Sequence, residues 1–357
     1  MTLDARPRSG PPRHRPPGTR PSPRAGWLAV PLAAVLATLL AVWASTPAPV
    51  PGIPLPSGPV DYGVPAARVL LDLALTAVLG LSLLPLLFSR RHERELHGVL
   101  RTAYRAALVA SVVWLGAALA SVVLQTAELA PVPGVTVATL STYVRGFSGA
   151  QALLASAGAA LLAALLATVG AGSGSQLPSR LLVITAGLGL LPLLATGHSG
   201  ALSERWHDLT MVSLELHVFA ATAWTGGLAA LAGLLLSRPP LLASALPRFS
   251  QLAGLCLAVV AVTGVLNALV ELATTPGAQL PSALLTSPYG QLVLAKTGCL
   301  AAACCCGAHI RFRLLPSVAR GRRTALAGWL AAELAVLGVA FGLAVVLSRT
   351  GVLNTGG

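Results

Sequence analysis

The sequence predicts an all-α, polytopic membrane helix bundle of about nine transmembrane helices. Of its 357 residues, 55% are hydrophobic and only 10% are charged, whereas a soluble domain carries about 25% charged residues. Nine separate stretches are apolar over about the 20 residues that a helix needs to cross a bilayer. We therefore expect a multi-pass integral membrane protein, with the lipid bilayer as one of its partners.

The predicted elements begin with residues 1–24, a stretch rich in Arg, Pro, Gly and Ser that we interpret as a disordered, basic cytoplasmic tail. A signal peptide is the alternative interpretation, but the apolar run after residue 26 is long for one. The fifth span is short and contains Gly187, Gly189 and Pro192, so its outer end is expected to be unwound. The nine spans are residues 26–46, 66–88, 105–127, 148–171, 180–196, 209–236, 250–272, 289–310 and 325–348. They divide into helices one to four within 25–178 and helices five to nine within 179–357.

Arginine placement predicts the orientation, with the N-terminus cytoplasmic and the C-terminus outside. The segments that this orientation assigns to the cytoplasm hold most of the arginines, as the positive-inside rule requires. The formal net charge of +13 is thus explained by short loops beside apolar runs, and we expect no nucleic-acid binding. The arginines assigned to the outer side are Arg68, Arg145, Arg205 and Arg349.

Polar residues concentrate where the fifth and sixth spans meet, between residues 196 and 228. On the sixth helix His207, Met211 and Glu215 recur every four residues and share one stripe. Thr210, His217 and Trp224 recur every seven residues and share a second stripe, while His198 comes from the end of the fifth span. Ionisable groups at membrane depth usually face the bundle interior and mark a pathway or a binding site.

Imidazole, thioether and carboxylate are ligand types that bind copper: the thioether suits Cu(I), and carboxylate oxygen suits Cu(II). His207 and His217 are about 15 Å apart along the helix axis, so they would serve two successive positions and not one ion. The alternative is that these histidines are interfacial residues hydrogen-bonded to the backbone, to Asp208 or to Glu215. The spacing matches no closed metal-binding motif, and both interpretations stay open.

Two further stripes lie on the seventh and eighth helices. Thr263, Asn267 and Glu271 recur every four residues, and Tyr289 and Lys296 are seven apart on one face. Lys296 lies about 10 Å below Tyr289, a depth at which we expect it to have a carboxylate partner. The candidate partners are Glu215, Glu271 and Asp72.

Other charged and small residues in the spans are expected to serve helix packing. Arg68 and Asp72 form an i, i+4 pair that can satisfy itself, and Glu333 is interpreted as interhelical packing with no evident partner. Gly226 and Gly227 predict that another helix approaches this part of the sixth helix closely.

Several motifs in the second half resemble the copper resistance D (CopD) membrane domain. They are Arg248-Phe249-Ser250, then Thr263-Gly264-x-x-Asn267-Ala268, then Thr286-x-x-Tyr289-Gly290-x-Leu292 with Lys296 following. The resemblance covers about residues 245–348. Upstream, Thr196-Gly197-His198 and the His217 to Gly227 segment resemble the longer form of the family. A departure is His309-Ile310-Arg311, where family members often have Asn-Arg.

The resemblance implies copper handling in the plasma (inner) membrane, either copper ion transport (uptake) or delivery to copper enzymes, and not catalysis. Copper would be the bound ion, with a separate periplasmic or extracytoplasmic copper-binding protein as a partner. By position the resemblance favours His198 and His217 over His207, with Met211 as a further candidate ligand. The candidate pathway or gating residues are Glu215, Trp224, Asn267, Glu271, Tyr289 and Lys296.

Two alternative functions remain open at this point. Paired histidines facing each other across helices would suit a haem-binding membrane redox protein, although only His198 and His217 could form such a pair. A scaffold for assembling copper enzymes, without transport, is the other alternative.

Overall fold

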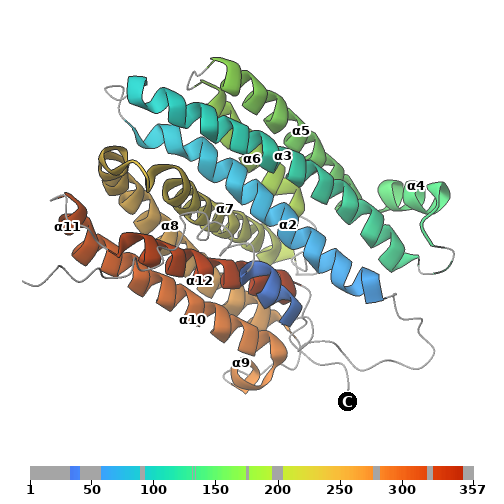
Figure 1. Ribbon diagram of the computed structural model, residues 1–357. Helices are drawn as coiled ribbons and strands as arrows, with labels where there is room; N and C mark the ends of the chain where they lie inside the picture. The colour runs from blue at the N-terminus through green and yellow to red at the C-terminus, as the bar shows by residue number, and fades with distance from the viewer. Residues whose placement is uncertain are drawn as a thin grey trace, which may run out of the picture.

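The computed structural model describes residues 33–40, 58–88, 93–130, 132, 134–173, 177–194, 204–275, 282–319 and 325–348. These residues form an all-α bundle, and none of them lies in a strand (Figure 1). The polytopic helix bundle predicted from the sequence is therefore confirmed.

The helices follow one another with short connections, and residues 33–40 form a short helix before the first labelled one. The labelled elements are α2 (Gly58–Leu83), η1 (Leu84–Leu87), α3 (Glu93–Leu129), α4 (Val137–Gly146), α5 (Ser148–Ser173), α6 (Leu177–Leu194), α7 (Glu204–Leu235), α8 (Pro239–Thr274), α9 (Ser282–Thr286), α10 (Pro288–His309), η4 (Ile310–Leu314), α11 (Leu315–Ala319) and α12 (Leu326–Leu347). Long Ala, Leu and Val runs favour helices here because a helix satisfies every backbone polar group within the segment, as lipid demands.

Seven of the described helical segments are long and apolar enough to cross a membrane. They correspond to seven of the nine predicted spans. The predicted span 180–196 coincides with α6, whose apolar part, Pro178–Pro192, is shorter than the others. The helix runs through Gly187 and Gly189 as far as Leu194. The total of nine spans and the sides of the two termini stay predictions.

Local signals explain where several helices begin. At α4, a short helix that the predicted spans do not include, the Thr136 side chain accepts a hydrogen bond from the Thr139 backbone N–H, and the Thr139 side chain accepts one from the Thr136 backbone N–H. Pro239 opens α8, where the missing N–H costs no intrahelical bond. The Ser287 hydroxyl caps α10 by accepting from the Gly290 backbone at 3.0 Å.

Two helix groups make up the bundle, joined by the packing of α2 against α7. α3 packs between α2 and α5, and α6 packs on α5, while α8 packs on α7 and α10 on α12. Figure 1 shows α2, α3, α5 and α6 on one side of the molecule and α8, α10 and α12 on the other, with α7 between them. α7 therefore lies at the centre of the arrangement, as its polar residues require.

Glycines allow α2 and α7 to touch through their backbones. A Cβ atom added at Gly80 would lie 2.0 Å from the carbonyl carbon of Gly226, and one added at Gly226 would lie 2.2 Å from the Thr76 carbonyl oxygen. The predicted close approach at Gly226 is confirmed, and α2 is the helix that makes it. At the next position the Phe249 ring of α8 packs against Gly227, 2.7 Å from where its Cβ would be.

Candidate functional site

The second stripe predicted on α7 faces the inside of the bundle. Thr210, His217 and Trp224 are 7%, 8% and 3% exposed, so the imidazole of His217 is turned away from lipid. Its partner on the neighbouring helix is Thr263, which is also buried, at 7% exposure. This inward face of α7 positions the groups that carry the chemistry.

The hydrogen bond between His217 and Thr263 determines which ring nitrogen is free. Nδ1 of His217 lies 3.0 Å from Oγ1 of Thr263, and the same hydroxyl donates to the Val259 carbonyl at 2.5 Å. A hydroxyl has one proton to donate, so towards His217 it accepts, and Nδ1 carries the hydrogen. The Val260 carbonyl also interacts with the ring and can only accept, which favours an N–H on the edge facing α8. In the neutral ring Nε2 then keeps its lone pair, as a metal-binding imidazole requires.

Lys296 supplies a positive charge to the same part of the bundle. It lies on α10 about two turns from the helix start, is half-buried, and interacts electrostatically with His217. Within the described residues no carboxylate lies within ion-pairing distance of its amine. Asp72, one of the expected partners, pairs instead with Arg68 at 3.2 Å, which confirms that i, i+4 pair.

The α8 stripe continues from Thr263 towards the C-terminal end of the helix. The side-chain oxygen of Asn267 is buried and accepts no hydrogen bond from the described residues, so it remains available to a donor or a cation. Glu271 is half-buried one turn further on and interacts electrostatically with Tyr289. The Tyr289 ring packs with Leu272 in a small apolar cluster. The stripe therefore places oxygen acceptors along one face of α8 towards its C-terminal end.

Several predicted ligands are not brought together with His217 by the described coordinates. His198 lies outside the described residues, as does the side chain of His207, whose backbone belongs to α7. Met211 and Glu215 are half-buried on the neighbouring stripe of α7. Across the residues that the structure describes, no group of three or more His, Cys, Asp or Glu side chains could hold a metal ion.

Sequence reasoning missed the partner of Glu333. Its carboxylate on α12 is 3% exposed and accepts a hydrogen bond from Nε1 of Trp224 at 3.2 Å. The two residues are 109 positions apart, so no local spacing connects them. The sequence offered one indication that Trp224 would contact another helix: it shares the buried face of α7 with His217.

Two family models match the chain. The family model described as copper resistance protein D matches residues 243–347, and the one described as copper resistance protein D-like, N-terminal domain, matches residues 59–207. The second match covers helices for which the motifs had indicated no specific resemblance. No curated protein and no solved structure matches the chain.

The two matches lie in order along the chain, and each contains described helices that are long and apolar enough to span a membrane. The motifs at Thr263, Asn267, Tyr289 and Lys296 fall inside the first match, and His198 falls inside the second. Copper handling in a membrane is what this family's description implies. The chain is therefore a multi-pass, copper-handling membrane protein that belongs to the copper resistance protein D family.

Proposed function

We propose that the chain moves copper ions across the plasma membrane, in the direction of uptake, or passes them on to copper enzymes. Copper would enter between the outer ends of α6 and α7 and bind His217 together with His198. A separate extracytoplasmic copper-binding protein would supply the ion. The family assignment supports copper as the cargo, and His217 supports the place at which it binds.

The observation that carries the proposal is the contact between Nδ1 of His217 and Oγ1 of Thr263, which lie 3.0 Å apart. Because that hydroxyl donates to the Val259 carbonyl, we infer that Nδ1 of His217 carries the hydrogen and that the lone pair of Nε2 is available to copper. Metal-binding histidines in proteins almost always donate their other N–H in this way.

Lys296 would act as a gate in this scheme. A protonated amine near His217 with no carboxylate pair among the described groups repels a cation. Loss of its proton, or its displacement, would admit copper to the path formed by Asn267 and Glu271. Copper entry would then be coupled to proton movement.

The experiment is copper uptake into proteoliposomes that contain the purified full chain. His217→Ala should abolish uptake, because it removes the ligand while leaving only a small cavity. The matched control is His97→Ala on α3, where the side chain is exposed. Metal analysis of detergent-purified protein, wild type beside a His198→Ala/His217→Ala double variant, measures binding independently of transport.

Unchanged uptake in His217→Ala would refute the proposed path. Copper that stays bound in the double variant would refute the histidine site. A Soret band in the absorption spectrum of the purified wild-type protein would instead favour the haem-binding alternative. Copper bound at His217 with no uptake by the wild type would favour the scaffold alternative.

A further inference from the structure

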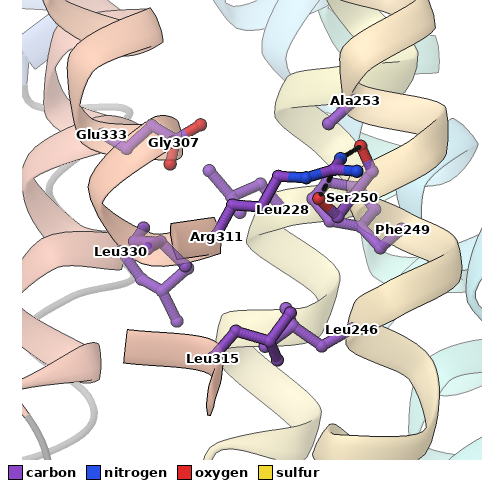
Figure 2. A pocket seen from close by; sticks show the side chains of 11 residues that line it. Leu228, Leu246, Phe249, Ser250, Ala253, Gly307, Arg311, Leu315, Leu330 and Glu333 are labelled. Carbon is purple, nitrogen blue, oxygen red and sulfur yellow. Dashed lines mark hydrogen bonds between the residues drawn. The ribbon is translucent and has the colours of Figure 1, made fainter. Parts of the chain in front are cut away.

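A second polar site lies at the arginine-rich end of the bundle, around Glu333. A cavity of about 50 Å³ separates α12 from α7 and α8 there. Figure 2 shows Glu333 and Gly307 on one side of this cavity and Ser250 on the other. About 10–15 Å³ is needed for each water molecule, so the cavity has room for roughly three. The Glu333 carboxylate therefore borders a space that water can enter.

The carboxylate of Glu333 has one hydrogen-bond donor and no compensating cation among the described residues. The donor is Nε1 of Trp224 at 3.2 Å. Arg311 lines the same cavity, but its guanidinium reaches Ser250, at 2.8 Å to Oγ and 3.2 Å to the carbonyl oxygen. Figure 2 shows the Arg311 side chain directed across the cavity to Ser250 and not to Glu333. The site thus holds an acid without an ion pair.

The surroundings of Glu333 offer few other titratable groups. On α10, the Cys306 thiol interacts electrostatically with the carboxylate, and His309 is stacked on Trp329 of α12 with the ring centroids 4.2 Å apart. The lining contributed by α7 and α8 is apolar apart from Ser250. No second carboxylate lines the cavity among the described residues.

This composition favours a proton over a metal cation as the ligand. An ionised carboxylate buried beside one indole donor costs several kcal/mol, and proton uptake removes that cost. Hard cations such as Mg²⁺ and Ca²⁺ take six or more oxygen ligands, and the cavity offers only a carboxylate and a hydroxyl already engaged by Arg311. One oxygen is sufficient for a proton.

We propose that Glu333 is a proton-binding site that exchanges with water through this cavity at the arginine-rich, cytoplasmic end of the bundle. Its proton comes from that water and returns to it, and Trp224 holds the charged form in place between exchanges. The site does not depend on copper. Trp224 and His217 lie seven residues apart on one face of α7, about 10 Å along the axis, so the proton site and the proposed copper site share a single helix face.

The test is pH-difference infrared spectroscopy of the full chain in copper-free proteoliposomes. Acidification should produce a protonated-carboxyl band that shifts in D₂O, and Glu333→Gln should remove it. The control Asp61→Asn, at an exposed carboxyl near the start of α2, should leave the band in place. Spectra that are the same for wild type and Glu333→Gln, or a band insensitive to D₂O, would overturn the proposal.

A second variant keeps the test decisive if Glu333→Gln does not fold. Trp224→Phe keeps the carboxyl group and removes its donor, so the band should change position, because the carboxyl stretch depends on hydrogen bonding. A band that does not move in this variant would overturn the assignment to Glu333. The copper-free sample separates this result from the copper path, which can fail while the proton site holds.

Discussion

Replacing Thr263 by Val tests the hydrogen bond that orients His217. Valine keeps the shape of the side chain but removes the hydroxyl that accepts from Nδ1 at 3.0 Å. The buried N–H then keeps only the Val260 carbonyl as an acceptor, and the loss of one hydrogen bond costs about 0.5–1.5 kcal/mol. A loss of that size in the orientation of a ligand corresponds to about 2- to 13-fold in affinity. Removing the residue that orients a metal-binding histidine costs about 10- to 100-fold, which overlaps the upper end of that range.

Copper affinity of the purified protein, measured by competition with a chelator of known affinity, reads out this loss. Thr263→Ser should stay close to wild type, since it restores the acceptor. Thr297→Val on α10 is the matched control, because that hydroxyl is exposed and bonds only to its own helix, at the Val293 carbonyl. Equal affinities for Thr263→Val and Thr297→Val would refute the view that Thr263 orients the ring.

Three further changes test the packing and the charges of the bundle. Gly80→Ala forces a Cβ into backbone atoms 2.0 Å away and should lower the stability in detergent by about 1–3 kcal/mol, whereas Gly116→Ala, with open space at its Cβ, should not. Lys296→Met removes the repelling charge and should raise copper affinity at least about tenfold, equivalent to 1.4 kcal/mol, and flatten its dependence on pH. Arg68→Gln leaves Asp72 unpaired and should cost about 1–2 kcal/mol, most of which the double variant Arg68→Gln/Asp72→Asn should recover.

Each of these three predictions has a result that would contradict it. Thermal unfolding that is the same for both alanine variants would contradict the backbone contact between α2 and α7. If Lys296→Met has the same copper affinity as the wild type, with the same dependence on pH, Lys296 does not act as a gate. If Arg68→Gln/Asp72→Asn is no more stable than Arg68→Gln alone, the cost of Arg68→Gln does not come from leaving the Asp72 carboxylate unpaired.

Local spacing accounts for what the sequence could predict of the site. The seven-residue repeat on α7 correctly placed His217 and Trp224 on one buried face, because that repeat spans nearly two turns of any regular helix. The four-residue spacing likewise predicted the pair between Arg68 and Asp72. Apolar runs predicted the spans because lipid allows few alternatives to a helix.

Contacts between distant segments were beyond such reasoning. Glu333 finds Trp224 across 109 positions, and nothing in the spacing of either helix indicates the other. Gly226 signalled that some helix would approach, but not that Gly80 of α2 would meet it. The expected carboxylate partner of Lys296 was wrong: among the described residues none of Glu215, Glu271 and Asp72 lies within ion-pairing distance of its amine, and Asp72 pairs with Arg68.

The backbone contact between Gly80 and Gly226 fixes the point at which α7 crosses α2. At this point the two helices cannot move closer together, and separating them would break close van der Waals contact. Gly226 lies about two-thirds of the way along the apolar part of α7. A rigid tilt of α7 about this contact that moves the half bearing His217 outward would therefore move the opposite half inward. The contact between the two glycines thus couples the positions of the two halves of α7 on either side of Gly226.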